Sequence, residues 1–221
     1  MTTGGLACYR HIAIEGAIGA GKTTLARELS SRVGAELVLE QPAENPFLGR
    51  FYGDMKGYAF QTQLFFLFQR QKQVQSIAQP TMFASTVVSD FMLAKDAIFA
   101  KLTLSDDEYR LYAQMYAPIS AQLPEPDLVI WLQAPASTLL ARVRKRAVAI
   151  EHGIDLAYLD RLCNAYVDFF ASYDGAPVLV VDTERFQPLQ RPGDVAELIQ
   201  ALERFQGRRN SLGAPADAVF D

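Results

Sequence analysis

The chain has 221 residues, of which half are hydrophobic, and a formal net charge of −4 at pH 7. This length supports one sizeable hydrophobic core, and the acidic balance argues against a nucleic-acid polymer as a partner, because such partners demand a basic face. No apolar stretch is long enough to span a bilayer and the first residues lack signal-peptide features, so we expect a soluble cytoplasmic protein with no membrane partner.

A glycine-rich loop follows the first apolar run, Tyr9–Ile14, which predicts a buried strand. The loop fits the pattern G-x-x-x-x-G-K-S/T at every fixed position. In this pattern the glycines let backbone N–H groups turn toward phosphate oxygens, the lysine neutralises the β- and γ-phosphates, and the threonine hydroxyl ligates Mg²⁺. A helix is predicted directly after the loop, with its N-terminus toward the anion. We therefore predict a nucleoside triphosphate site formed by Gly16, Ala17, Ile18, Gly19, Ala20, Gly21, Lys22, Thr23 and Thr24.

A short predicted strand, Ala35–Leu39, leads directly to Glu40. Pro42 and Pro46 keep the following backbone out of a helix, so Glu40 is expected on a loop. Open α/β sheets bind ligands at the carboxyl ends of their strands, and the phosphate loop belongs to the same edge. Glu40 is therefore expected to reach a phosphate-transfer centre; the alternative is a surface carboxylate without a role in catalysis.

A long segment without Gly or Pro, Tyr58–Ala78, predicts a helix with a broad apolar face. Gln63 and Arg70 lie seven residues apart and so share one face of this helix. An amide and a guanidinium on a mostly apolar helix can read the edge of a nucleobase. The alternative is that both are ordinary interfacial polar residues.

A β-branched strand, Thr86–Ser89, ends at Asp90. A carboxylate at the end of a later strand in a phosphate-loop fold usually helps to hold Mg²⁺, so Thr23 and Asp90 are the predicted metal ligands. A further helix is expected to begin at residue 106 and to end before Pro118, because proline cannot continue a helix.

The second half of the chain continues the alternation of strands and helices. Apolar strands are predicted at Leu128–Leu132 and Pro177–Val181, with helices over 137–148, 156–172 and 194–205. The first of these helices carries a cluster of cations that forms either a lid closing onto a transferring phosphate or a solvated helix face. The cluster is Arg142, Arg144, Lys145 and Arg146.

Five apolar strands alternating with helices predict an α/β fold. We expect a three-layer P-loop NTPase fold, with a five-stranded parallel sheet flanked by helices and an Arg-rich lid. Because there is no internal repeat or interdomain linker, residues 1–206 are expected to form a single domain. The remaining residues, 207–221, are rich in Gly, Arg, Pro and Ala and are expected to be a mobile tail.

These motifs resemble the deoxyribonucleoside kinase family, nearest its bacterial deoxyadenosine/deoxyguanosine and deoxycytidine kinase branch, over nearly all of the chain to about residue 185. In that family the strand after the phosphate loop ends in the general base for the nucleoside 5′-hydroxyl, which implies this role for Glu40. A tyrosine that binds the sugar 3′-hydroxyl lies eleven residues before the base-reading glutamine, and Tyr52 and Gln63 have that separation. Arg70 matches an arginine near the base, and Phe99 matches the phenylalanine that stacks on it.

The lid segment resembles the family without gaps from Gln133 to Leu159. This similarity maps Arg142 and Arg146 onto lid arginines, and Glu151 onto the glutamate that holds the 3′-hydroxyl. The resemblance also implies that residues 1–206 are a P-loop kinase domain and that the protein is a homodimer formed through helices beside the sheet.

One departure from the family concerns the residue after Asp90. The family usually carries Glu/Asp-Arg-Ser after the third strand, with the Arg near the 5′-oxygen and the phosphate, whereas here Phe91 follows Asp90. Either another cation, such as Arg70, Lys95 or a lid arginine, replaces the missing one, or the activity is altered. The position near the base that often holds Asp falls on Lys95 or Asp96, depending on a shift of one residue, which leaves the base preference open.

The resemblance implies transfer of the γ-phosphoryl group of ATP, or another NTP, to the 5′-hydroxyl of a deoxyribonucleoside, giving a dNMP for nucleotide salvage. A purine deoxyribonucleoside or deoxycytidine is favoured over thymidine. Glu40 would accept the proton, while Lys22, Arg142, Arg146 and Mg²⁺ would stabilise charge on the transferring group. The alternatives are a nucleoside monophosphate kinase similar to thymidylate kinase, which needs a further arginine at the acceptor, and a nucleotide-binding subunit without catalysis.

Overall fold

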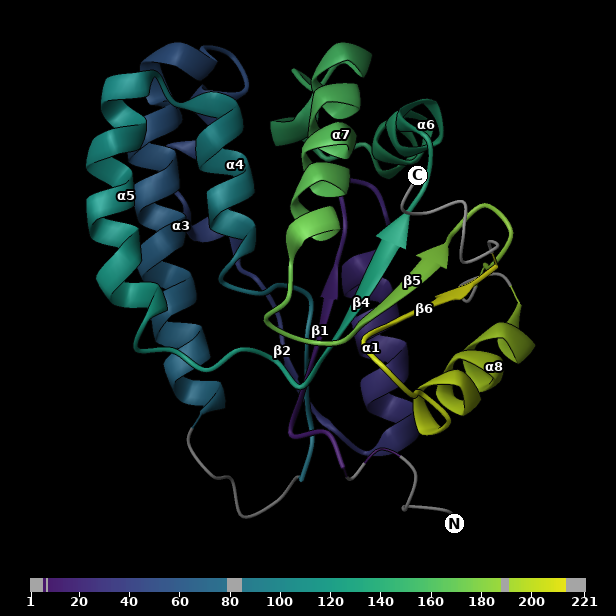
Figure 1. The fold of residues 1–221 in the computed structure, drawn as a ribbon. Helices are drawn as coiled ribbons and strands as arrows, with labels where there is room; N and C mark the ends of the chain where they lie inside the picture. The colour runs from purple at the N-terminus through teal and green to yellow at the C-terminus, as the bar shows by residue number, and fades with distance from the viewer. Residues whose placement is uncertain (1–5, 7, 79–84, 188–190, 214–221) are drawn as a thin grey trace.

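The computed structural model describes residues 6, 8–78, 85–187 and 191–213, and these residues form one parallel sheet between layers of helices (Figure 1). Its six strands are β1 (His11–Glu15), β2 (Glu36–Val38), β3 (Val87–Ser89), β4 (Leu128–Gln133), β5 (Val178–Asp182) and β6 (Arg209–Leu212). The strand order is β2-β3-β1-β4-β5-β6, and all five pairings are parallel. Parallel neighbours need crossover connections, which the helices provide.

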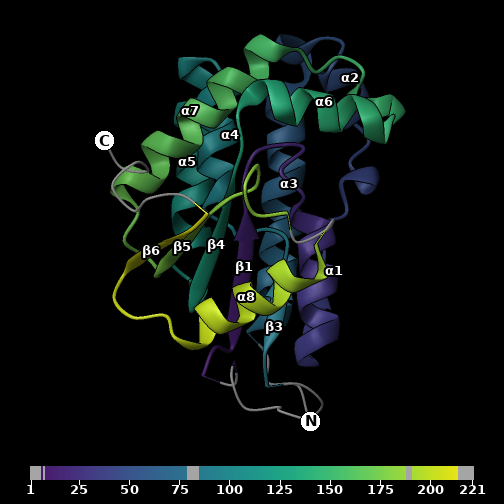
Figure 2. The same ribbon diagram turned by 90° about the vertical axis from the view of Figure 1, so that its right-hand side faces the viewer.

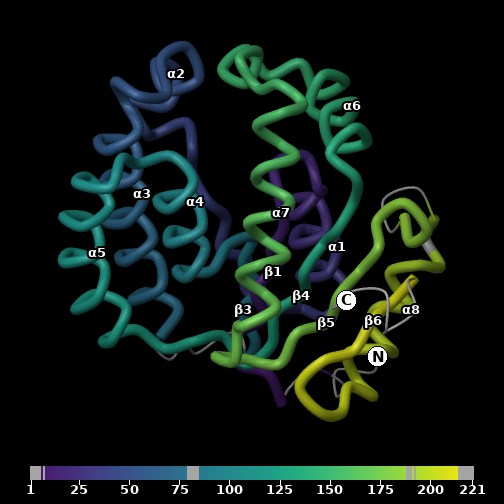
Figure 3. Tube along the Cα trace, turned by 45° about the horizontal axis from the view of Figure 1, so that its top comes forward, coloured from purple at the N-terminus to yellow at the C-terminus, as the bar shows by residue number. Residues whose placement is uncertain are grey.

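Helices cover both faces of the sheet. They are α1 (Lys22–Val33), α2 (Leu48–Phe51), α3 (Met55–Ile77), α4 (Lys95–Thr103), α5 (Asp106–Ser120), α6 (Ala136–Arg146), α7 (Leu156–Ser172) and α8 (Pro192–Glu203), with 3₁₀ turns η1 (Pro42–Glu44) and η2 (Ala149–Glu151). α1 and α8 lie on one face and α4 and α7 on the other, with α3 and α5 beyond α4 (Figures 1 and 2). α2 and α6 stand over the carboxyl ends of the strands (Figure 3). None of the described helices has the length and apolar character that crossing a bilayer requires.

The central strands β1, β4 and β5 are buried along nearly their whole length, which explains their continuous apolar runs. Trp131 of β4 stacks on Phe170 of α7, with ring centroids 4.5 Å apart, and joins the sheet to one helical layer. Leu29 of α1 and Leu198 of α8 are fully buried in the same core and join the other layer to it. Both layers therefore hold the carboxyl ends of these strands in fixed positions.

The predicted three-layer α/β architecture is confirmed, but the sheet has six strands rather than the five expected. The sixth, β6, lies within 207–221, the segment expected to be a mobile tail, and its Arg209 pairs with Val178 of β5. β6 is a polar, partly exposed edge strand, so it has no apolar run by which sequence analysis could detect it. Residues 214–221 lie outside the described part of the chain.

The other predicted strands and most helices match the observed ones to within about three residues at each end, the usual uncertainty of helix and strand boundaries. α5 also ends within this range, but it continues to Ser120 and includes Pro118, so the prediction that it ends before Pro118 is wrong. Proline removes only one N–H, and close to the end of a helix this loss is small. The N–H of Ala121 still donates to the carbonyl of Ala117 at 3.1 Å, which closes the last turn.

His11, at the start of β1, is buried against β3. Its Nε2 lies 2.8 Å from the hydroxyl oxygen of Ser89. Because that hydroxyl donates its own hydrogen to the carbonyl of Phe91 at 2.7 Å, the His11 ring donates to Ser89 from Nε2. Burial lowers the pKa of His11 to about 4, against the opposing effect of Asp127. The ring is therefore neutral in the folded protein at neutral pH.

We expect His11 to make the protein less stable as the pH falls from 6.5 to 4. In this window His11 binds a proton in the unfolded chain but not in the folded chain. The stability that the neutral ring contributes to the folded protein is therefore complete above pH 6.5 and is lost as the pH falls toward 4. Since one pKa unit corresponds to about 1.4 kcal/mol, the loss reaches about 3 kcal/mol. Urea unfolding across this window checks the prediction. His11→Gln should flatten the acid slope, whereas the exposed control His152→Gln should not, and equal slopes in both would contradict it.

Candidate active site

The phosphate loop depends on the backbone conformations of its glycines. Gly16 has a φ of 145° and Gly19 a φ of 89°, in the left-handed region that favours glycine. A Cβ at Gly16 would lie 2.4 Å from the carbonyl oxygen of Leu132 in β4, and one at Gly19 would lie 2.8 Å from that of Leu139 in α6. The loop therefore fits tightly between the end of β1 and the connection from β4 to α6.

Glu15, the last residue of β1, is fully buried beneath the phosphate loop. Its Oε2 accepts hydrogen bonds from the N–H of Gly16 at 3.2 Å and from the hydroxyl of Tyr166 at 3.0 Å. Its Oε1 accepts from the N–H of Met92 at 2.8 Å. One buried carboxylate thus ties the phosphate loop to α7 and to the segment that follows β3.

Lys22 folds back over the phosphate loop. Its Nζ donates to the carbonyl oxygens of Gly16 at 2.7 Å and Ala17 at 3.2 Å. Burial, followed by the charge of Lys95, lowers the pKa of Lys22 to about 8, although nearby carboxylates oppose this shift. A bound polyphosphate would favour the charged ammonium, so anion binding and protonation of Lys22 reinforce each other.

Thr23 and Asp90, the predicted metal ligands, lie in contact. The hydroxyl of Thr23 donates to Oδ2 of Asp90 at 2.5 Å, and the N–H of Glu40 donates to Oδ1 at 2.7 Å. No group of three or more His, Cys, Asp or Glu side chains suited to a metal occurs in the described part of the chain. A hydroxyl beside one carboxylate fits Mg²⁺, which usually takes one or two protein ligands and completes its shell with phosphates and water.

One cavity of about 550 Å³ opens beside the phosphate loop, a size that suits a small molecule. Part of its wall is apolar and comes from α2, α3 and α4, with Phe51, Phe66 and Phe99. The structure brings to this cavity every residue that is predicted to bind the phosphoryl acceptor, together with Lys22, Thr23 and Arg146. The residues predicted to bind the acceptor are Glu40, Tyr52, Gln63, Arg70, Asp90, Phe99 and Glu151.

Glu40 lines this cavity and lies between two cations. Nε of Arg70 donates to Oε1 of Glu40 at 2.9 Å, and Nζ of Lys95 donates to Oε2 at 3.0 Å. The Nη1 of Arg70 also donates to Asp96, so this guanidinium bridges two carboxylates. Burial raises the pKa of Glu40, but the charges and hydrogen bonds of Arg70 and Lys95 outweigh it and hold the pKa at about 2. Glu40 is therefore ionised at neutral pH.

Three buried polar atoms of the cavity wall have no hydrogen-bond partner among the described residues. They are Oγ1 of Thr62, Oε1 of Gln63 and the hydroxyl oxygen of Tyr158. Because buried polar groups are nearly always hydrogen-bonded, we expect a water molecule or a polar group of a ligand beside these atoms. Thr62 and Tyr158 were missed by sequence analysis, since a threonine and a tyrosine on amphipathic helices look like ordinary core residues.

The two lid arginines have different partners. Arg146 donates to both carboxylate oxygens of Glu151, at 2.6 and 2.7 Å, and lines the cavity. Arg142 instead donates to the hydroxyl and carbonyl oxygens of Thr183 after β5, both at 2.8 Å, and does not line the cavity. The lid also contacts the acceptor side, because a Cβ at Gly153 would lie 2.4 Å from the carbonyl oxygen of Tyr52.

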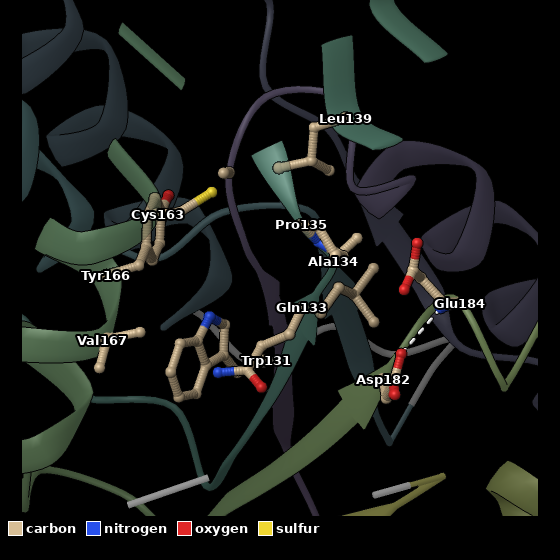
Figure 4. Close-up of a pocket in the computed structure, with 12 residues that line it drawn as sticks. Trp131, Gln133, Ala134, Pro135, Leu139, Cys163, Tyr166, Val167, Asp182 and Glu184 are labelled. Carbon is tan, nitrogen blue, oxygen red and sulfur yellow. Dashed lines mark hydrogen bonds between the residues drawn. The ribbon is translucent and has the colours of Figure 1, made fainter. Parts of the chain in front are cut away.

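A second cavity, of about 400 Å³, lies between α7 and the carboxyl ends of β4 and β5. Figure 4 shows Trp131, Cys163 and Tyr166 on one side of it and Asp182 and Glu184 on the other. It has two carboxylates and, among the described residues, no lysine or arginine. This lining repels phosphate, so the first cavity is the better site for phosphoryl transfer.

Comparison with known proteins identifies the family, because the family model for deoxynucleoside kinase matches residues 12–205. The chain belongs to the deoxynucleoside kinase family. It is similar to the deoxyguanosine kinase of Bacillus subtilis (38% identity over 70% of this chain and 75% of that protein) and to the deoxyadenosine kinase of Dictyostelium discoideum (33% identity over 93% and 84%). Among solved structures, a deoxyadenosine kinase from M. mycoides has a TM-score of 0.77 and 29% identity, over 88% of this chain and all of that one.

Family membership confirms the resemblance inferred from the motifs. The protein is therefore a phosphotransferase with an alcohol acceptor, as the sequence predicted, and uses a nucleotide as its phosphoryl donor. The P-loop NTPase fold is confirmed in the same way.

Loss of the Tyr166 hydroxyl should destabilise the protein measurably. Tyr166→Phe would remove a buried donor to the Glu15 carboxylate, and hydrogen bonds to charged groups contribute about 1.5–3 kcal/mol. Tyr173→Phe is the matched control, because that hydroxyl donates to the exposed carboxylate of Glu125 at 2.8 Å and water can replace it, at a cost of about 1 kcal/mol or less. Urea unfolding measures both losses, and equal losses would contradict the role given to Glu15.

Proposed function

We propose that the protein transfers the γ-phosphoryl group of ATP, or another NTP, to the 5′-hydroxyl of a deoxyribonucleoside. The observation that carries this proposal is the shared cavity. The phosphate-loop residues Lys22 and Thr23 line it together with Glu40, the ionised carboxylate expected to act as base. A donor phosphate and an acceptor hydroxyl would therefore meet in one space.

Glu40 is the general base of the proposed reaction. It accepts the proton of the 5′-hydroxyl while the oxygen attacks the γ-phosphorus, and Lys22 and Arg146 stabilise negative charge on the transferring group. Mg²⁺, held by Thr23 and Asp90, would supply further positive charge beside the phosphates when bound. Arg142 bonds Thr183, beyond the wall of the cavity, which supports a role on the donor side of the lid rather than at the acceptor.

The opposite end of the cavity suits a nucleoside. Tyr52 and Glu151 would hold the sugar 3′-hydroxyl, and Phe99 would stack on the base. Gln63 has an unpartnered Oε1, and Arg70 lines the same wall, so both support contacts to the base edge. The M. mycoides deoxyadenosine kinase has been solved with bound dATP and with bound dCTP, which supports a purine deoxyribonucleoside or deoxycytidine as acceptor here.

Neither alternative function fits the cavity as well. A nucleoside monophosphate would bring a doubly charged phosphate beside the ionised Glu40, and the arginine nearest to it, Arg70, is already paired with Glu40 and Asp96. A nucleotide-binding subunit without catalysis would not need an ionised carboxylate such as Glu40 beside the phosphate loop. The intact set of Lys22, Thr23 and Glu40 therefore favours an enzyme.

We further propose a cytoplasmic homodimer. Both cysteines are free thiols, which suits a reducing compartment. Large apolar residues are exposed on three outer helices, Phe68 on α3, Leu111 on α5 and Val167 on α7. Exposed apolar residues on helices beside the sheet support association through those helices.

We expect ADP release from ATP and Mg²⁺ with deoxyadenosine, deoxyguanosine or deoxycytidine, and less with thymidine. The measurement is a coupled ADP assay across the four deoxyribonucleosides and dTMP, with no acceptor as the blank. ADP release with dTMP alone would favour a nucleoside monophosphate kinase. Release with none of them would overturn the proposed enzyme.

Glu40→Gln should lower kcat by about 10²–10⁴-fold, because it removes the general base but keeps the size of the side chain. Affinity for the deoxyribonucleoside should stay within about threefold of the original, since Glu40 binds no part of the base. Glu44→Gln is the matched control: this nearby carboxylate is exposed and lies outside the cavity. The kinetic constants and calorimetric affinities check both variants. Near-normal turnover in Glu40→Gln would rule out its role as base.

A further inference from the structure

The residue after Asp90 cannot supply the cation that related motifs place there. Phe91 is fully buried and does not line the cavity. A cation near the 5′-oxygen is nevertheless useful, because negative charge develops there as the acceptor loses its proton. Another residue of the cavity could supply that charge.

Four cations line the cavity in the described part of the chain, and three of them already have other proposed roles. Lys22 lies over the carbonyls of the phosphate loop, where the donor phosphates belong. Arg70 is held by two carboxylates, and Arg146, which binds both oxygens of Glu151, is proposed to contact the transferring group. The fourth, Lys95, forms an ion pair with Glu40.

Lys95 lines the cavity beside the proposed base. It is the first residue of α4 and is almost fully buried, and its Nζ lies 3.0 Å from Oε2 of Glu40. Lys22 lines the same cavity, so the two ammonium groups face a common space. An anionic group bound in that space would face both cations.

We propose that Lys95 is a catalytic residue that stabilises the 5′-oxygen during attack and takes the place of the arginine missing after Asp90. This inference rests on the proposed function. In the step, the 5′ O–H bond breaks and its proton goes to Glu40 while the oxygen bonds to the γ-phosphorus. The bond from the γ-phosphorus to the β–γ bridging oxygen breaks, and its electron pair leaves with the nucleoside diphosphate.

Charge balance explains why Lys95 suits this step. Before transfer, its ammonium is paired with the Glu40 carboxylate. When Glu40 takes the proton, it becomes neutral, and the negative charge moves to the 5′-oxygen within hydrogen-bond distance of it. An ammonium has three N–H donors and can contact both oxygens, so Lys95 stays paired with one negative charge throughout.

The test compares Lys95→Met, which removes the charge at similar size, with Lys95→Arg, which keeps it. The matched control is Lys101→Met, an exposed lysine on the same helix. Lys95→Met should lower kcat by about 10²–10³-fold, Lys95→Arg should recover part of the loss, and Lys101→Met should stay within about twofold. Circular dichroism confirms that each variant is folded.

Binding of product separates catalysis from a merely structural role. If Lys95 contacts the 5′-oxygen and the transferred group, Lys95→Met should weaken binding of the deoxyribonucleoside 5′-monophosphate by about tenfold or more, and of the deoxyribonucleoside by less than about threefold. Calorimetry with deoxyadenosine and dAMP, or with the best acceptor and its monophosphate, measures this difference. Equal weakening of both ligands would overturn the inference, as would unchanged kcat.

The wild-type assay distinguishes failure of this inference from failure of the proposed function. If the wild type phosphorylates no deoxyribonucleoside, the proposed function is wrong. If it does so and Lys95→Met is equally active, only the role of Lys95 is wrong.

Discussion

The Glu40 carboxylate lies between two buried cations, and the chemistry proposed for the site depends on this arrangement. Taking a carboxylate out of water costs free energy, which the ion pairs with Arg70 and Lys95 offset. Burial raises the pKa of Glu40, but the cations outweigh it and hold the pKa at about 2. A base this weak takes a proton only from a hydroxyl that is becoming strongly acidic, as a hydroxyl does while it bonds to phosphorus. Proton transfer is thereby tied to phosphoryl transfer.

The parallel sheet explains why residues distant in the sequence meet at this carboxylate. Glu15 ends β1, whereas Glu40 and Asp90 follow β2 and β3, and these strands are neighbours in the order β2-β3-β1. All three strands run in the same direction, so their carboxyl ends reach one edge. The hydrogen bond from the N–H of Glu40 to Asp90 joins two of these ends directly. The sheet therefore sets the positions of the acids, and the helices add the walls of the cavity.

Strand direction also decides which parts of the site could be predicted from the sequence. Glu40 and Asp90 could be placed because the last residue of a parallel strand points to a known edge. The partner that each side chain contacts could not be predicted. Arg142 and Arg146, for example, are four residues apart and share a helix face. The first nevertheless bonds Thr183 and the second lines the cavity. Likewise β6, a polar edge strand, has no hydrophobic period, so only its pairing with β5 reveals it.

The adjacent residues Lys95 and Asp96 show the same limit, because a shift of one residue exchanges their roles. In the fold, Lys95 reaches Glu40 in the cavity, while Asp96 is buried behind it and receives Arg70. Arginine has a rigid planar fork that can bridge two carboxylates in a fixed geometry, whereas lysine carries a compact charge on a flexible stem. In the proposed reaction, Arg70 therefore holds the general base Glu40 in place, and Lys95 follows the negative charge from Glu40 to the acceptor oxygen.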